Sequence, residues 1–265
     1  MKAPIGVIDS GVGGLTVAKE IMHLLPNEEI IYIGDTARCP YGPRTSEEVR
    51  KFTWQMAIAL SKMKIKMLVI ACNTATAVAL NSLSKKMPFP VIGVIFPGAR
   101  AAIKATKKNE IVVLGTSGTI KSGAYEKAIA ALNTSSKIIP LACPTFVPIV
   151  ESNEYEGDFA RKMVFEALQP LKSEHFDTVI LGCTHYPLLQ KHIEDAVGEH
   201  VNVLSSAEET AQDVLEYLDY HHLRNPTEIQ KEPIFYTTGS VPIFKTIVEK
   251  WLNLSNADIR TISFH

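Results

Sequence analysis

The sequence predicts an α/β fold made of two pseudo-symmetric domains, each a largely parallel sheet flanked by helices, with the active site in the cleft between them. Three observations predict it. Short apolar runs alternate with longer amphipathic patterns along most of the 265 residues. The apolar runs are typical of strands buried on both faces, as in parallel sheets covered by helices. Similar motifs also recur in pairs along the chain.

Each predicted strand is a short apolar run. In chain order the strands are 5–9, 30–34, 67–71, 91–94, 110–115, 137–141, 178–182, 201–204, 234–238 and 259–263. Most of these strands are separated by segments in which apolar residues recur every three or four positions, a spacing typical of amphipathic helices. Examples are 45–64, 75–86, 99–107, 122–132, 159–171 and 208–221. Thr45 and Glu48 fit a capping box, and Pro97 suits the first turn of a helix.

Three pairs of motifs recur at a nearly constant separation, each after an apolar run, and they indicate an internal duplication. The pairs are Ile8-Asp9-Ser10-Gly11 with Gly115-Thr116-Ser117-Gly118, Cys39-Pro40 with Cys143-Pro144, and Cys72 with Cys183. We therefore predict one domain at 1–97 plus 208–265 and a second at 98–207, with the break near Pro97. Ligands bind beyond the carboxyl ends of strands in such sheets, so these ends are the places to search.

The composition is that of an ordinary globular protein, with 46% hydrophobic residues, 21% charged residues and a net charge of −1. No basic tract indicates a nucleic-acid partner, and no apolar run approaches the length of a membrane span. The N-terminal residues pass directly into a strand-like run, which favours a cytoplasmic location. The four cysteines are expected to be free thiols there.

The placement of Cys72 and Cys183 is the main chemical signal. Each follows an apolar run and precedes a short polar group that can open a helix. A helix N-terminus stabilises a thiolate, so both are candidate bases or nucleophiles with a lowered pKa. Two of them suggest a site with an acid/base thiol on each side. Cys39 and Cys143 lack this context and are interpreted as small buried hydrophobic residues.

Two further candidates lie beside strand ends. Asp9 leads into the glycine-rich run 10–14, which suits close backbone approach to a ligand, with amides free to bind an anion. Asp9 is equally compatible with a simple Asx cap. His185 lies two residues after Cys183 and fits either proton transfer at that thiol or a capping role.

The remaining polar features are weaker signals. The loop 35–43 after the second strand suits ligand binding or ordinary turn chemistry. Glu151, by residue type alone, is interpreted as a solvated loop side chain. The two strand-end cysteines and the nearby histidine lack a C-x-x-C partner, so no metal is predicted. No lysine stands out as an anchor for pyridoxal phosphate, and no cofactor is predicted.

Long motifs spread over nearly the whole chain resemble those of the glutamate racemase family, within the aspartate/glutamate racemase superfamily. The motifs are Ile8-Asp9-Ser10-Gly11-Val12-Gly13-Gly14-Leu15-Thr16, Gly34-Asp35-Thr36-Ala37-Arg38-Cys39-Pro40-Tyr41-Gly42, Ala71-Cys72-Asn73-Thr74-Ala75-Thr76, Phe146-Val147-Pro148-Ile149-Val150-Glu151, Leu181-Gly182-Cys183-Thr184-His185-Tyr186-Pro187-Leu188 and Phe235-Tyr236-Thr237-Thr238-Gly239.

The resemblance implies a cofactor-independent isomerase that converts L-glutamate to D-glutamate for peptidoglycan, and so for cell-wall biogenesis and cell shape. It also implies a homodimer. The thiol matching Cys72 takes the α-proton of D-glutamate, and the thiol matching Cys183 takes that of L-glutamate. Asp9, Glu151 and His185 match residues that assist the thiols. The matching substrate-binding residues are Asp9, Ser10, Tyr41, Gly42, Asn73, Thr74, Thr184 and His185.

Two alternatives remain open at this stage. One is a racemase of aspartate or another acidic amino acid, because the sequence alone does not define side-chain length selectivity. The other is a non-catalytic protein that binds small anions through the glycine-rich turn and helix N-termini. The second alternative leaves the paired thiols without a role.

Overall fold

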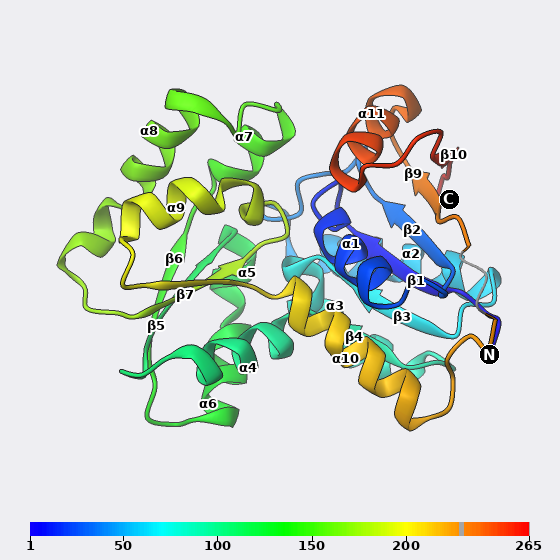
Figure 1. The fold of residues 1–265 in the computed structure, drawn as a ribbon, viewed down its shortest axis with the longest axis horizontal. Helices are drawn as coiled ribbons and strands as arrows, with labels where there is room; N and C mark the ends of the chain where they lie inside the picture. The colour runs from blue at the N-terminus through cyan, green and yellow to red at the C-terminus, as the bar shows by residue number, and fades with distance from the viewer. Residues whose placement is uncertain (228–230, 265) are drawn as a thin grey trace.

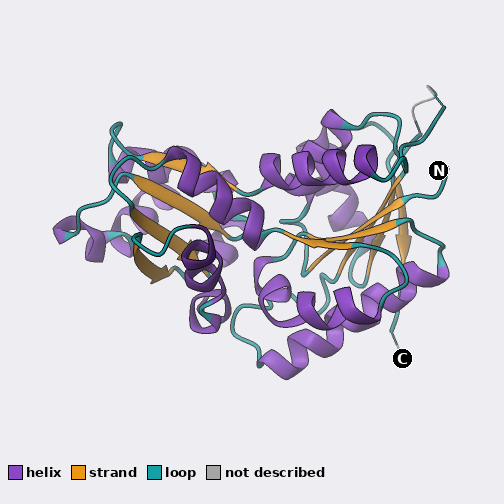
Figure 2. Cartoon of the chain, turned by 90° about the horizontal axis from the view of Figure 1, so that it is seen from below, coloured by secondary structure: helices purple, strands orange, loops and turns teal. Residues whose placement is uncertain are grey.

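Two α/β lobes make up the molecule, each with its own parallel sheet (Figure 1). The structure is a computed structural model that describes residues 1–227 and 231–264. Helices cover both faces of each sheet (Figure 2), which confirms the predicted fold class.

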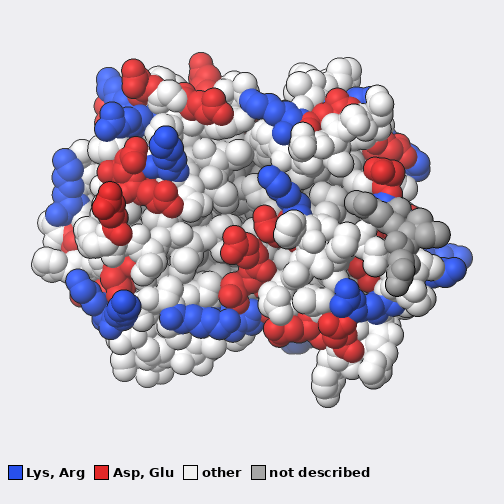
Figure 3. Space-filling model, viewed as in Figure 1, with Lys and Arg blue, Asp and Glu red and all other residues white. Residues whose placement is uncertain are grey.

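Within the described residues, no helix is long and apolar enough to cross a membrane. Acidic and basic side chains are interspersed over the face drawn in Figure 3.

The first sheet has the strand order β10-β9-β2-β1-β3-β4, and all its neighbouring strands are parallel. Its strands are β1 (Ile5–Asp9), β2 (Ile30–Gly34), β3 (Met67–Ile70), β4 (Val91–Gly93), β9 (Ile234–Thr237) and β10 (Asp258–Thr261). Every residue of β1, β2 and β3 is buried, because helices cover both faces. These strands therefore carry apolar side chains in both directions, as parallel strands require.

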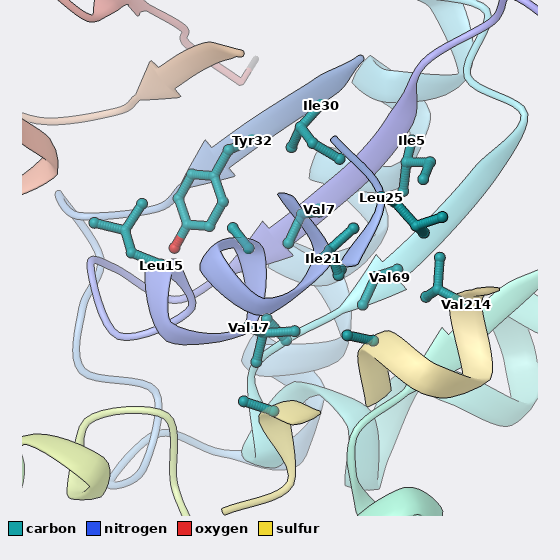
Figure 4. Packing of buried hydrophobic residues seen from close by; sticks show 14 of the residues in the cluster. Ile5, Val7, Leu15, Val17, Ile21, Leu25, Ile30, Tyr32, Val69 and Val214 are labelled. Atoms are coloured by element: carbon teal, nitrogen blue, oxygen red, sulfur yellow. The ribbon is translucent and has the colours of Figure 1, made fainter. Parts of the chain in front are cut away.

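Helices α1 (Leu15–Leu24), α10 (Ala207–Tyr220) and α11 (Val241–Leu252) cover one face of the first sheet. Figure 4 shows the α1 side of this core, where Ile21 and Leu25 point toward Ile5 and Val7 of the central strand. Helices α2 (Ser46–Lys62) and α3 (Asn73–Lys86) cover the opposite face. Burial of these apolar side chains holds the lobe together.

The second sheet has the order β6-β5-β7-β8, again all parallel. Its strands are β5 (Glu110–Gly115), β6 (Lys137–Ala142), β7 (Thr178–Gly182) and β8 (Asn202–Ser205). Helices α4 (Ile95–Ala105) and α6 (Ala124–Leu132) cover one face, while α7 (Phe146–Glu151), α8 (Gly157–Ala167) and α9 (Gln190–Val197) cover the other. The short elements are α5 (Ser117–Ser122), η1 (Gln169–Ser173) and η2 (Tyr186–Leu189).

The predicted strands match the observed ones to within two residues at every end, whereas the helices predicted at 99–107 and 159–171 each differ by four residues at one end. The helix predicted at 122–132 starts only at Ala124, because Gly123 adopts a left-handed conformation (φ +62°) and separates α5 from α6. The helix predicted at 159–171 ends at Ala167 and is followed by the 3-10 helix η1. The one predicted at 99–107 begins at Ile95, so Pro97 lies inside the first turn of α4.

The chain crosses between the lobes at two places, from β4 into α4 and from β8 into α10. The two crossing helices contact each other, and Arg100 of α4 is paired with Glu209 and Asp213 of α10. The division into domains 1–97 with 208–265 and 98–207 stays a prediction. Its boundary near Pro97 falls within the first crossing helix.

The capping box at Thr45 is confirmed, since the Thr45 hydroxyl accepts from the Glu48 amide and the Glu48 carboxylate accepts from the Thr45 amide. We expect Thr45→Ala to lower the free energy of unfolding by about 1 kcal/mol, because the hydroxyl's hydrogen bonds with the Glu48 amide and the Glu48 carboxylate are lost. Urea unfolding checks this. Ser46→Ala, at the exposed neighbouring position, is the control, and equal losses in both variants contradict the prediction.

Candidate active site

Residues at the carboxyl ends of four inner strands, two from each sheet, lie where the two lobes meet. Asp9 ends β1 and Cys72 follows β3 in the first sheet, whereas Thr116 follows β5 and Cys183 follows β7 in the second. Direct contacts join the two groups: the Thr184 hydroxyl donates to an Asp9 carboxylate oxygen at 3.3 Å. Carboxyl ends of parallel strands meet here from both sheets, which is the position expected for a ligand site.

Cys72 caps the N-terminus of α3, and its Sγ accepts a hydrogen bond from the Ala75 amide at 3.4 Å. The predicted lowering of its pKa is nevertheless wrong. Burial raises the pKa of Cys72 to about 12, and the negative charge of Asp9 adds to this, because both effects outweigh the helix-end hydrogen bond. The thiol is therefore protonated in the ligand-free protein at neutral pH.

Cys183 precedes a helix, as predicted, but it does not cap that helix and the first turn is of the 3-10 type. The four-residue 3-10 helix η2 follows, and α9 starts only at Gln190. The partner of Cys183 is instead a side chain, since its Sγ lies 3.8 Å from Nδ1 of His185. This contact favours the proton-transfer role over the capping role among the two that the sequence left open for His185.

Glu151 completes a chain of three side chains. Its Oε1 lies 2.6 Å from Nε2 of His185, which itself is buried. Glu151 ends helix α7 and is paired, so its interpretation as a solvated loop side chain is wrong. Burial lowers the pKa of His185, but its contacts with Cys183 and Glu151 raise it more, to well above the ordinary value. The same contact holds the pKa of Glu151 below its usual range against the effect of burial.

Asp9 is completely buried, and burial raises its pKa above the ordinary value. Its Oδ2 accepts from the Gly11 amide at 2.9 Å, which is the Asx-cap geometry, and its Oδ1 accepts from Thr184. Its charge also acts on Cys72. Both alternatives for Asp9 therefore hold together: it caps the turn and belongs to the site.

The glycine-rich turn after Asp9 packs against the opposite lobe. A Cβ at Gly13 would lie 2.4 Å from His185 Nδ1, and one at Gly11 would lie 3.2 Å from Glu151 Oε1. The Gly11 amide donates to the Asp9 carboxylate at 2.9 Å. The prediction that the amides of the turn are free for an external anion is therefore wrong at Gly11, because the protein's own carboxylate occupies this amide.

The predicted substrate-binding residues Tyr41 and Gly42 lie in the loop after β2 and help to hold this loop in place. Tyr41 is buried, and its hydroxyl donates to Asp35, which also pairs with Arg38. Gly42 touches the second lobe: its carbonyl accepts from the Gly118 amide at 2.9 Å. Together these contacts fix the loop after β2 against both lobes.

Asn73 presents a buried donor without a protein partner. Its Oδ1 accepts from the Tyr125 hydroxyl at 2.7 Å, whereas no atom of the described residues accepts from its buried Nδ2. Buried amide groups are usually satisfied, so this NH₂ group suits an acceptor on a ligand. Its neighbour Thr74 bonds Thr116 at 2.9 Å and Thr119 at 3.1 Å, across the two lobes.

Three residues of this region were not predicted to contribute. Thr116 and Thr119 extend the hydroxyl cluster. Thr116 corresponds to Asp9 in the internal repeat, which is a signal available in the sequence. Cys39, interpreted as a buried hydrophobic residue, is only half-buried, and its thiol donates to Glu151 at 3.6 Å. No sequence signal distinguishes it, because the contact is made across the lobes. Cys143 is buried as predicted.

A cavity of about 170 Å³ opens beside these residues, between the lobes. Its walls are mainly apolar and include Pro40, Gly42, Pro43, Thr116, Pro144 and Val147. All four cysteines are free thiols. The two strand-end cysteines and His185 do not form a metal-binding group among the described residues; the group of potential ligands found there joins Cys39, Glu151 and His185.

Two parallel-sheet lobes that meet at buried thiol, carboxylate and imidazole groups form an α/β protein with the groups that acid–base chemistry requires. The sequence profile of the family described as Asp/Glu/Hydantoin racemase matches residues 5–214. The chain belongs to this family.

Relatives and solved structures are similar along the whole chain. Glutamate racemase of Lysinibacillus sphaericus is 69% identical over 263 residues, covering 99% of each chain. Glutamate racemase of Listeria monocytogenes serotype 4a is 56% identical over 262 residues, covering 99% of this chain and 98% of the relative. The crystal structure of the glutamate racemase isoform RacE1 from Bacillus anthracis has 48% identity and a TM-score of 0.96, with coverage of 99% and 98%. These likenesses confirm the family resemblance inferred from the motifs.

The pairing of His185 with Glu151 leads to a prediction about protonation. We expect Glu151→Gln to lower the pKa of His185, because the hydrogen bond to a charged carboxylate is lost. Nuclear magnetic resonance of the imidazole during a pH titration measures this. Glu154→Gln, an exposed change three residues away, is the control.

The raised pKa of His185 also determines how the free energy of unfolding depends on pH. Since the folded pKa of His185 is raised, its contribution to stability is complete below the unfolded value of about 6.5 and is lost as the pH rises through the folded value. An unchanged His185 titration in Glu151→Gln would contradict the pairing.

Proposed function

We propose that the chain interconverts L-glutamate and D-glutamate without a cofactor, using Cys72 and Cys183 as two bases. The observation that carries the proposal is that each thiol follows an internal strand of a different sheet, beside contacts that join the lobes. The similarity to glutamate racemases at up to 69% identity over nearly the whole chain supports the substrate. A crystal structure of the Francisella tularensis glutamate racemase, in complex with D-glutamate, has a TM-score of 0.92 at 32% identity.

Inversion at Cα requires proton removal on one face and proton return on the other. In the proposed scheme one cysteine reacts as the thiolate, takes the α-proton and becomes a thiol. The other begins as the thiol, gives its proton to the opposite face and becomes the thiolate. Cys72 acts on D-glutamate and Cys183 on L-glutamate, so each direction starts from the opposite protonation pattern.

His185 and Glu151 assist Cys183 in this scheme. The thiol proton passes from Sγ to Nδ1 of His185, which lies 3.8 Å away, and this leaves a thiolate beside an imidazolium. Glu151 stabilises the imidazolium through its 2.6 Å contact with Nε2. A general acid–base pair of this kind typically contributes about 10²–10⁴-fold in rate.

Asp9 assists on the side of Cys72. The pKa of Cys72, about 12 in the ligand-free protein, must fall before this thiol can react as a thiolate. The α-ammonium group of the substrate, bound beside Asp9, supplies positive charge and offsets the carboxylate that raises this pKa. Substrate binding thus prepares the thiol for reaction.

Donors around the thiols hold the carboxylates of the substrate. The free Nδ2 of Asn73 points to an acceptor that the protein does not supply. The proposed binding residues are Asp9, Ser10, Tyr41, Gly42, Asn73, Thr74, Thr184 and His185. Donors that are already oriented stabilise the charge of a carbanion without reorganisation, which lowers the barrier for removal of a weakly acidic α-proton.

Glutamate is favoured over the alternatives. An aspartate racemase homologue from Pyrococcus horikoshii is 20% identical and the Picrophilus torridus aspartate racemase is 15% identical, which supports a shared fold, whereas the Lysinibacillus sphaericus glutamate racemase is 69% identical. A non-catalytic anion-binding protein would need free amides in the glycine-rich turn, where the Gly11 amide already donates to the Asp9 carboxylate. The proposal extends to D-glutamate supply for peptidoglycan, a cytoplasmic location and a homodimer, supported by the family motifs.

The direct test uses the purified chain with L-glutamate and no added cofactor. Loss of the circular dichroism of L-glutamate, together with deuterium entering Cα from D₂O, is the expected result. Stable dichroism with no deuterium in the product would reject the racemase proposal.

Single-thiol variants test the two bases. We expect Cys72→Ala and Cys183→Ala each to lose racemisation by about 10²–10⁴-fold or more, because one face lacks its proton donor or acceptor. With β-chlorinated glutamates, each variant should still release chloride from one enantiomer, L for Cys72→Ala and D for Cys183→Ala.

Cys143→Ala removes a buried thiol and serves as the matched control. Chloride release from both enantiomers by one single-thiol variant would argue against bases with opposite facial preference, and near-normal racemisation in either variant would exclude the two-base scheme.

A further inference from the structure

Cys39, Glu151 and His185 bring three metal-ligating atoms together at the lobe junction. The atoms all lie within 4.8 Å of one another, in the one such group among residues 1–227 and 231–264. Cys39 comes from the loop after β2, Glu151 from the end of α7 and His185 from the segment after β7. One sulfur, one nitrogen and one carboxylate oxygen make a donor set that suits zinc.

We infer that this cluster is an inhibitory Zn²⁺ site in which Cys39, Glu151 and His185 hold the ion and withdraw His185 and Glu151 from Cys183. The inhibitory part rests on the proposed racemase function. The metal is a regulator here and takes no part in the reaction, so the activity itself requires no ion.

The geometry of the cluster is close to what zinc needs. Ligand atoms on one tetrahedral zinc lie about 3.5 Å apart, given bonds of about 2.0–2.3 Å. The Cys39 sulfur is 3.6 Å from Glu151 Oε1, and the 2.6 Å contact between Glu151 and His185 must open by about 1 Å. The side chain of Glu151 is 30% exposed and Cys39 is half-buried, so an ion can enter from solvent.

Occupation would change the site in two ways. When the ion binds the Cys39 sulfur and Nε2 of His185, the protons on those two atoms leave to solvent, and the one proton left on the imidazole lies on Nδ1, so Nδ1 can no longer accept the proton of Cys183. The ion would also join the loop after β2 in the first lobe to two residues of the second lobe. Both effects oppose turnover, in both directions of the reaction.

Binding is tested with Co²⁺ on the full chain, because a thiolate–Co²⁺ bond gives a charge-transfer absorption that needs no activity. We expect one bound ion that Zn²⁺ displaces, a lost absorption in Cys39→Ser, and weakened binding in Glu151→Gln. The absorption should persist in Cys72→Ala, Cys183→Ala and Cys143→Ala. Loss in Cys183→Ala with retention in Cys39→Ser would overturn the site, as would the absence of any thiolate band.

Inhibition is tested separately. Saturating Zn²⁺ should lower racemisation by about 10²-fold, the lower range of a general acid–base contribution, and a chelator should restore it. Cys39→Ser, confirmed as folded by circular dichroism, should resist Zn²⁺ when its racemisation is compared with its own metal-free rate in the presence of a chelator. Inhibition of Cys39→Ser equal to that of the unmodified chain would overturn the inference. If the chain is not a racemase, the Co²⁺ binding result still decides the metal site.

Discussion

The buried pairing of charged groups at the lobe junction is the interaction on which the rest of the structure depends. Asp9 is buried completely and His185 nearly so, and unpaired charges at such depth are costly. Asp9 takes its partner, the Thr184 hydroxyl, from across the junction. His185 pairs with Glu151 of its own lobe, and Glu151 in turn accepts from the Cys39 thiol of the first lobe. These bonds fix how the two sheets meet, and so where the thiols stand.

The two thiols have different surroundings, and this difference has chemical consequences. Cys72 sits at a helix N-terminus next to a buried carboxylate, which raises its pKa together with burial. Cys183 instead contacts an imidazole that is paired with Glu151. In the proposed reaction, Cys183 gains its base from the protein, whereas Cys72 gains positive charge from the substrate. Pseudo-symmetric lobes thus carry an asymmetric acid–base arrangement.

The glycine-rich turn illustrates how one motif can serve packing and chemistry together. At Gly13 any larger residue would meet the ring of His185, so glycine is required for contact between the lobes. The hydroxyl of Tyr32 donates a hydrogen bond to the Gly11 carbonyl at 2.8 Å. The same close approach brings Cys39 to Glu151 and creates the cluster proposed to bind zinc.

The sequence by itself determined the strands, the fold class and the strand-end positions of both thiols, because apolar runs and their polar ends are local properties. It also identified Asp9 and His185 as candidates beside those strand ends. Only the tertiary structure decided that Glu151 pairs with His185, that Cys39 joins them, and that burial outweighs the helix end at Cys72. The physical reason is that burial and pairing at each of these groups depend on atoms distant in the chain, many of them from the opposite lobe.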